Sequence, residues 1–153
     1  MVAALAAMTE QEFKPQDVNI YRPYPDDIPW ELLLLADPDE SRIYEYADAD
    51  YMRVAKLEDE SIGVYVVRAL SPTVYELCNL AVAPAWRRRG LGRWLLGHAI
   101  GIAESKGGRE IVVSIPVPGG GHAPPPSAGW RGLFERTGFV AGDRELRLVL
   151  TPE

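Results

Sequence analysis

Hydrophobic positions in the first half of the chain fall into short runs that predict strands and two short helices. Prolines and acidic residues of turn-forming type separate these runs. The expected strands are residues 18–24, 51–57, 62–70 and 73–82. The leucine-rich segment 30–36 predicts a short helix, and residues 38–40 have the pattern of the start of a second one. The pattern is typical of antiparallel hairpins.

The second half predicts a strand–helix–strand unit. Apolar residues recur at helical spacing between residues 90 and 106, and Gly107 and Gly108 end this helix. Its apolar face comprises Leu91, Leu95, His98, Ala99, Ile102 and Ala103. Segment 111–115 is continuously apolar, which favours a strand buried on both faces in a parallel pair. We expect the crossover to be right-handed, with a ligand-binding turn at the carboxyl end of the preceding strand.

The last forty residues predict a loop, a helix and a strand. Stretch 116–126 is rich in proline and glycine, and it is either a surface connection or a lid that faces the substrate. Ser127 is a suitable N-cap for a helix that continues to Thr137. Gly138-Phe139 closes this helix, and segment 145–150 has the pattern of a final strand.

The order of these elements predicts the fold class. A chain of 153 residues is long enough for one domain with a single core. We expect residues 18–153 to form this domain and residues 1–17 to be a flexible N-terminal extension. The predicted fold is α/β, with a central mixed, largely antiparallel sheet, one parallel strand pair and flanking helices.

Charge and residue usage exclude several classes of partner. The net charge of −6 argues against nucleic acid, which needs a broad basic surface. No apolar run reaches the length of a membrane span, so we expect no membrane partner. The single cysteine, Cys78, excludes an intrachain disulfide and suits the cytoplasm. The two histidines and Cys78 show no metal-ligand spacing, so we expect no metal.

Segment 80–93 carries the strongest chemical signal in the chain. It reads Leu-Ala-Val-Ala-Pro-Ala-Trp-Arg-Arg-Arg-Gly-Leu-Gly-Arg, the end of a strand followed by a basic turn and a helix start. Glycine lets backbone N–H groups approach a ligand, and the first N–H groups of a helix have no intrahelical partner. Such a turn binds phosphate or pyrophosphate, and its arginines add positive charge. The sequence therefore predicts a phosphorylated cofactor.

The glycine spacing distinguishes among phosphate-binding motifs. Gly90-x-Gly92 lacks the third glycine of a dinucleotide motif, and the Gly-Lys-Ser/Thr of a mononucleotide loop is absent. Arg87-x-x-Gly90-x-Gly92 resembles the coenzyme motif of the GNAT acetyltransferases. That family often has Leu-x-Val-x-Pro before the motif, supplied here by Leu80, Val82 and Pro84. The resemblance covers roughly residues 51–139 and implies that the parallel pair is splayed where acetyl-CoA binds.

The resemblance also implies which residues hold the coenzyme. Backbone groups at the strand end would pair with the pantetheine arm, and the N–H of Val82 would stabilise the oxyanion. N–H groups of residues 88–93 would bind the pyrophosphate, while arginine side chains reach phosphate oxygens or the 3′-phosphate. Ser127 lies near a position where an asparagine often contacts the coenzyme. The implied set is Leu80, Ala81, Val82, Arg87, Arg88, Arg89, Gly90, Leu91, Gly92, Arg93, Ser127 and Phe134.

Acyl transfer to an amine needs a group that accepts a proton. An alkyl ammonium with a pKa near 10.4 is deprotonated at neutral pH at a cost of roughly 4 kcal/mol, and a carboxylate can take the proton. Glu76 is the leading candidate, because histone-modifying members of the superfamily place a catalytic glutamate six residues before the equivalent of Val82. The alternative is an ion pair with Arg53 or Arg68. Alternation puts Glu76 and Val82 on one face and Asn79 on the other, unless a bulge intervenes.

Phe134 departs from the family pattern. Many members have a tyrosine four residues before the glycine of Gly-Phe, where it protonates the leaving thiolate, and phenylalanine has no proton to give. Water, His122 or Tyr75 remain as donors, or the thiolate leaves unaided, since a thiol pKa of about 8.5 makes that tolerable.

Other reactive or aromatic side chains are interpreted as structural. Cys78 lies in an apolar strand and is expected to be a small core residue. His98 is expected to be packed or partly exposed and not catalytic. Trp86, Trp94 and Trp130 are expected to pack in the core or at its rim instead of stacking on adenine.

The predicted function is acetyl-CoA-dependent N-acetylation of an amine. The acceptor stays open among a small polyamine, an aminoglycoside, a protein N-terminus and a lysine. The alternative is a coenzyme A-binding sensor or interaction module without catalysis, which Phe134 favours and Glu76 opposes. The sequence leaves the oligomeric state open, a homodimer included.

Overall fold

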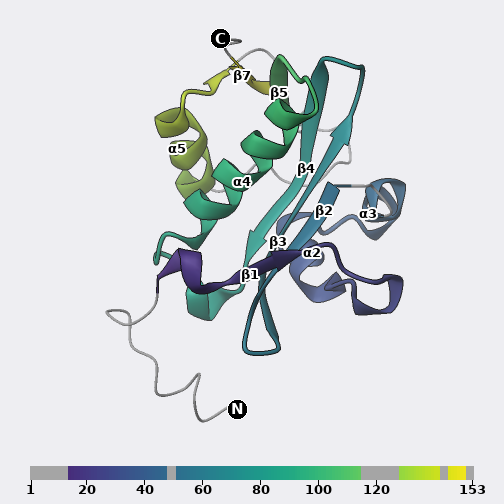
Figure 1. Ribbon diagram of the computed structural model, residues 1–153, viewed down its shortest axis with the longest axis vertical. Coiled ribbons are helices and arrows are strands. Elements are labelled where there is room, and N and C mark those ends of the chain that lie inside the picture. Colours follow the sequence, from purple (N-terminus) through teal and green to yellow (C-terminus); the bar gives the residue numbers. More distant parts are fainter. Residues whose placement is uncertain (1–13, 48–50, 115–127, 142–144, 151–153) are drawn as a thin grey trace.

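The computed structural model describes residues 14–47, 51–114, 128–141 and 145–150 (Figure 1). The expected loop 116–126, His122, Ser127 and residues 1–13 of the expected extension lie outside this part. In chain order the elements are η1 (Pro15–Asp17), β1 (Asn19–Tyr21), η2 (Pro25–Asp27), α2 (Trp30–Ala36), α3 (Glu40–Tyr46), β2 (Tyr51–Leu57), β3 (Glu60–Ala69), β4 (Val74–Val82), η3 (Pro84–Trp86), α4 (Leu91–Ser105), β5 (Glu110–Ser114), α5 (Ala128–Thr137), β6 (Val140–Ala141) and β7 (Glu145–Val149). None of the helices described is both long and apolar enough to cross a membrane.

The strands form one mixed sheet in the order β1-β2-β3-β4-β5-β7-β6. Within the described residues, neighbouring strands are antiparallel except for β4 and β5, which are parallel. The expected fold class is therefore confirmed. Strand β6 was not expected, because two residues carry too little pattern to be recognised.

Helices cover both faces of the sheet, and each face has its own apolar cluster. Buried side chains of α4 and α5 pack with Ala55, Tyr65, Leu77, Leu80 and Val82 on one face. Buried side chains of α2 and α3 pack with Met52, Val54, Val64, Val66 and Ala81 on the other. Figure 1 shows α4 and α5 on one side of the molecule and α2 and α3 on the opposite side. The strand residues alternate between the two clusters, as a sheet covered on both faces requires.

Helix α4 lies close against the sheet. Leu91, Leu95, Ala99 and Ala103 are buried at intervals of four residues, so they line one face of the helix. A Cβ atom built on Gly63 of β3 would lie 2.7 Å from Leu95 Cδ1. The absence of a side chain at Gly63 therefore allows α4 to pack at this distance, which fixes the start of the helix relative to the strands.

Candidate coenzyme site

Strands β4 and β5 pair over only part of their lengths. The parallel ladder runs from Val74 opposite Glu110 to Glu76 opposite Val112. Strand β4 continues to Val82, whereas the rest of β5 pairs with β7 on its other side. Among the described residues, no strand pairs with this edge of β4 beyond Glu76. The two parallel strands therefore stop pairing after Glu76, as the family resemblance implies, and the edge of β4 left without a strand partner is called the gap below.

Hydrogen bonds at the end of β4 show which backbone groups face the gap. The N–H of Ala83 donates to Ile62 O at 2.8 Å, toward β3. Successive residues of a strand direct their backbone groups to opposite edges, so those of Val82 and Leu80 point away from β3 and into the gap. The position of Arg87 agrees, because its Nε donates to Val82 O at 3.0 Å.

Two of the three strand-end residues expected to contact the coenzyme are thus suitably oriented. Ala81 lies opposite Val64 in the ladder with β3, so its backbone groups point to β3. The N–H groups of Leu80 and Val82 point into the gap, where an extended ligand arm can pair with them as a strand would.

The turn between β4 and α4 has a backbone geometry that suits an anion. Arg88 and Gly90 have φ values of +63° and +88°, and these left-handed residues reverse the chain before the helix. The N-cap residue of α4 is Gly90, which has no side chain to cap the first turn. The N–H groups of Leu91, Gly92 and Arg93 have no intrahelical acceptor, since they belong to the first turn. The fifteen-residue helix adds the positive end of its dipole at the same place.

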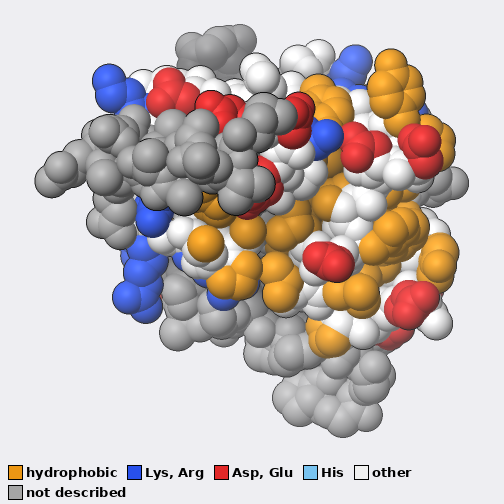
Figure 2. Space-filling model, turned by 90° about the horizontal axis from the view of Figure 1, so that it is seen from below, with side chains coloured by type: hydrophobic (Ala, Val, Ile, Leu, Met, Phe, Trp, Pro, Cys, Tyr) orange, Lys and Arg blue, Asp and Glu red, His pale blue; other side chains and the backbone are white. Residues whose placement is uncertain are grey.

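The four arginines of this turn fall into two groups. Arg87 donates to Val82 O, and the guanidinium of Arg89 lies 5.0 Å from the centre of the Trp86 ring. Arg88 and Arg93 are exposed. In Figure 2, Lys and Arg side chains gather on the side where Figure 1 places α5 and the start of α4. Arg87 and Arg89 therefore stabilise the turn, while Arg88 and Arg93 are the more available for phosphate oxygens.

Glu76 lies at the last residue of the parallel ladder, where the gap begins. The residue is only 7% exposed, and its Oε1 accepts a hydrogen bond from Arg68 Nε at 2.7 Å. Arg68 is directly opposite Glu76 in the ladder between β3 and β4. The structure therefore contains the ion pair with Arg68 that the sequence analysis named as the alternative role of Glu76. A carboxylate has about four lone-pair sites on its two oxygens, so the hydrogen bond from Arg68 alone does not prevent proton transfer.

A bulge in β4 corrects the expected orientation of Glu76. Asn79 pairs with Val66 and Leu77 pairs with Val67, so Cys78 is an extra residue on β4. Glu76 and Asn79 consequently lie on the α2–α3 face, while Val82 packs on the α4 face. The prediction that Glu76 and Val82 share a face is wrong, because the extra residue reverses the alternation.

Buried aromatic and thiol groups lie near these elements. Phe134 is buried and packs against Phe139 with the ring centres 5.3 Å apart. Cys78 packs at the edge of the α2–α3 cluster, and burial raises the pKa of its thiol well above the usual range. Tyr75 packs in the α4-side cluster, on the face opposite Glu76, and burial raises the pKa of its phenol. Neither group is prepared to ionise at neutral pH.

Two further kinds of side chain that the sequence analysis interpreted as structural lie outside the gap. His98 is exposed on α4, and its Nδ1 contacts the hydroxyl of the buried Tyr65. Desolvation lowers the pKa of this imidazole. Trp86 is buried as expected, whereas Trp94 is 44% exposed and so packs only partly.

Comparison with known proteins identifies this arrangement. The sequence model of the Acetyltransferase (GNAT) family matches residues 9–139. The chain belongs to the GNAT family. The resemblance first found in segment 80–93 is therefore confirmed over most of the chain.

Solved GNAT structures share the whole fold. A GNAT family acetyltransferase from Elizabethkingia anophelis, with acetyl-CoA bound, has a TM-score of 0.76 and 25% identity, covering 88% of this chain and 99% of that one. The IAA acetyltransferase from Bacillus cereus ATCC 14579 has a TM-score of 0.73 and 28% identity, covering 87% and 99%.

A curated GNAT relative matches a shorter region. The uncharacterized N-acetyltransferase YvbK of Bacillus subtilis (strain 168) is 34% identical over 84 residues. The match covers 55% of this chain and about half, 54%, of the length of YvbK.

Sequence reasoning missed two sets of contacts around this GNAT site. A Cβ atom on Gly90 would lie 3.2 Å from Pro15 Cγ, so η1 supports the turn. Asn79, Tyr46 and Asp37 form a buried polar network beneath α2 and α3. Both sets join residues far apart in the sequence. A polar Asn79 inside a mostly apolar strand was the signal available for the second set.

Proposed function

We propose that the chain transfers an acetyl group from acetyl-CoA to an amine. The observation that carries this proposal is the gap between β4 and β5, which opens directly beside the uncapped N-terminus of α4. N–H groups of Leu80 and Val82 face the gap, and those of Leu91, Gly92 and Arg93 face an anion at its mouth. Together they fit an extended thioester arm that ends in a pyrophosphate. The acetyl-CoA bound to the Elizabethkingia relative supports the same assignment.

We expect the amine to approach from the α2–α3 face of the sheet. The α4 side of the gap is occupied by packed side chains that include Leu80, Val82 and Leu95. Glu76 lies on the other face, at the point where β5 diverges. The carboxylate of Glu76 would first accept one ammonium proton, which frees the lone pair of the amine nitrogen. That nitrogen would then form the C–N bond as the C–S bond breaks, and its second proton would pass through water to the departing thiolate, so that the products are the amide and the thiol of coenzyme A. The N–H of Val82 would donate to the carbonyl oxygen as charge develops on it.

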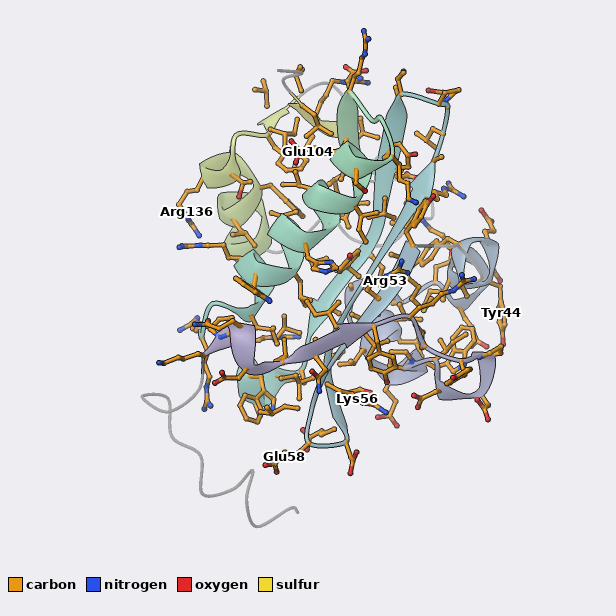
Figure 3. All side chains as sticks on the ribbon, in the orientation of Figure 1. Tyr44, Arg53, Lys56, Glu58, Glu104 and Arg136 are labelled. Carbon is orange, nitrogen blue, oxygen red and sulfur yellow. The ribbon has the colours of Figure 1, made fainter. Side chains whose placement is uncertain are left out.

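The decisive experiment compares Glu76→Gln with Glu104→Gln. Glu104 is exposed near the carboxyl end of α4, far from the basic turn (Figure 3). With a panel of amines and a thiol dye, we expect kcat/KM of Glu76→Gln to fall by about 100-fold or more, since general base catalysis contributes about 10²–10⁴-fold. Acetyl-CoA affinity measured by calorimetry should change by less than about 2-fold, because Glu76 makes no contact with the coenzyme in this proposal. Glu104→Gln should match the wild type.

A second function, coenzyme A binding without catalysis, has two observations in its favour. Phe134 is buried where the family resemblance implies a tyrosine, and Arg68 already holds Glu76. Binding of acetyl-CoA with no thiol release across the panel would establish this reading. Equal turnover by the wild type and Glu76→Gln would instead remove Glu76 from the mechanism and leave acetyl transfer standing.

A further inference from the structure

A buried polar network joins β4 to the two helices on the Glu76 face. Asn79, Tyr46 and Asp37 are each no more than 4% exposed. Asn79 Nδ2 donates to Leu33 O at 3.0 Å and to Tyr46 Oη at 2.9 Å. Tyr46 Oη in turn donates to Asp37 Oδ2 at 2.9 Å. One amide thus reaches α2 through its backbone and α3 through a side chain.

The bulge is what places this amide beneath the helices. Without the extra residue at Cys78, strand alternation would direct Asn79 to the α4 face. The bulge turns Asn79 toward α2 and α3 and puts it on the same face as Glu76. Cys78 Sγ lies 3.8 Å from Glu76 Oε1, so the network and the proposed base are adjacent along the strand.

The helices depend on such a contact for their position. Each has seven residues, about two turns, which is too short to be stable alone. The connection between them is also held by Asp37, whose Oδ1 accepts from Asp39 N at 3.2 Å. Asp39 then caps α3 by accepting from Arg42 N at 3.2 Å. Asp37 therefore links the Asn79 contact to the start of α3.

Asn79 is not the side chain that stability alone favours here. Its Oδ1 is buried and has no hydrogen-bond partner among the described residues. An unsatisfied buried acceptor costs free energy, and an apolar residue of similar shape would avoid that cost. The two hydrogen bonds that the amide donates are directional, unlike apolar packing. They therefore fix α2 and α3 at one place over an otherwise apolar surface.

We propose that Asn79 is a positioning residue that holds α2 and α3 against β4 as a fixed wall beside Glu76. The wall would also control acceptor binding, and this part of the inference rests on the proposed function, which brings the amine to this face. Loss of the amide should let the two helices open locally while the sheet and the coenzyme turn stay folded. Acceptor affinity should fall, and coenzyme affinity should not.

The test compares Asn79→Leu with Val66→Ala in the full chain. Val66 is fully buried, lies directly opposite Asn79 and belongs to the same cluster, but its side chain makes no hydrogen bond. By hydrogen exchange, Asn79→Leu should speed amide exchange in residues 30–46 by 10-fold or more relative to residues 60–69. Val66→Ala, which removes packing alone, should change both segments together. The proposal would be overturned if the exchange rate of residues 30–46, divided by that of residues 60–69, were the same in the two variants.

A second variant and a kinetic measurement sharpen the result. Tyr46→Phe keeps the ring but removes both bonds of the hydroxyl, the one from Asn79 and the one to Asp37. The bond from Asn79 to Leu33 O in α2 stays, so faster exchange should be confined to residues 37–46. In acetylation assays, Asn79→Leu should raise the acceptor KM about 5-fold or more with kcat within 2-fold and acetyl-CoA affinity unchanged. An unchanged acceptor KM in a working assay would overturn the role in acceptor binding. If no amine is acetylated, the proposed function fails, whereas exchange still decides whether Asn79 holds the helices.

Discussion

The turn at residues 87–93 and the helical segment 30–46 lead to opposite faces of the sheet and carry opposite charges. The turn holds four arginines and no acidic residue, a net charge of +4. Segment 30–46 holds five acidic residues and one arginine, a net charge of −4. In Figure 2, many of the basic side chains gather toward the left, and most of the hydrophobic ones lie at the centre and right, whereas acidic side chains occur on both sides. Under the proposed function, the basic side attracts a polyanionic coenzyme and the acidic side attracts a protonated amine.

The two regions are also held in place by different means. The turn depends on backbone conformation, through Arg88 and Gly90 in the left-handed region. The helices depend on side chains, through Asn79 and Tyr46. Coenzyme binding should therefore be lost when a substitution changes the backbone of the turn, and acceptor binding when a substitution removes a side chain that holds the helices.

The largest separate effect should come from Gly90→Val. A β-branched residue at φ +88° is strained, and its Cβ would also press on Pro15 Cγ at 3.2 Å. We expect acetyl-CoA affinity, measured by calorimetry, to weaken by about 10- to 100-fold, because about 1.4 kcal/mol of strain corresponds to tenfold. Gly97→Val is the control on the same helix, where a Cβ meets nothing within 4 Å. Equal losses in both variants would show that helix propensity, not the turn, decides binding.

A smaller effect, on the pH dependence of stability, should show whether water reaches Cys78 of β4 on the α2–α3 face. Burial raises the pKa of Cys78 above its ordinary value of 9.0, so the folded thiol stays neutral while the unfolded thiol ionises. The resulting stability is fully present well below pH 9.0, the ordinary pKa of the thiol, and is lost as pH rises from there toward the folded pKa. Wild type should lose about 1 kcal/mol more than Cys78→Ala between pH 7.5 and pH 10, measured by urea denaturation. Parallel curves would mean that water reaches the thiol.

The smallest effects should come from single charges, one on each side. Arg93→Gln should weaken acetyl-CoA binding about 2- to 4-fold, and Glu45→Lys should raise KM for a cationic amine by a similar factor, since exposed charges contribute little individually. Each variant should leave the other ligand unaffected, and both effects should shrink at 0.5 M salt. A loss of coenzyme affinity in Glu45→Lys would break the separation of the two sides.

The sequence predicted the elements well where one pattern dominates. The helix at residues 30–36 and the strand at 51–57 have the expected bounds, because leucine clustering and alternation are local signals. The turn at residues 87–93 was equally readable, since glycine spacing and arginine content need no tertiary information. The parallel partner of β4 followed from the apolar run beginning at Ile111.

The rest depended on contacts between distant residues. The bulge at Cys78 lies in a run of mostly apolar residues, where no alternation marks an extra position. The direction of Glu76 was missed for that reason. The bond from Arg87 to Val82 O and the network from Asn79 to Asp37 are set by how elements dock, which composition does not encode.

The short ladder between β4 and β5 has a thermodynamic consequence. The ladder has three residue pairs, so β4 and β5 are hydrogen-bonded over only part of their shared edge in the middle of the sheet. A ligand that binds between β4 and β5 beyond this ladder binds the folded state alone. It should therefore raise the melting temperature in proportion to the logarithm of its concentration. At 100 times Kd the gain is about 2.7 kcal/mol, comparable to a well-packed core side chain. Under the proposed function, acetyl-CoA is this ligand, so the stability of the folded protein should rise with the acetyl-CoA concentration.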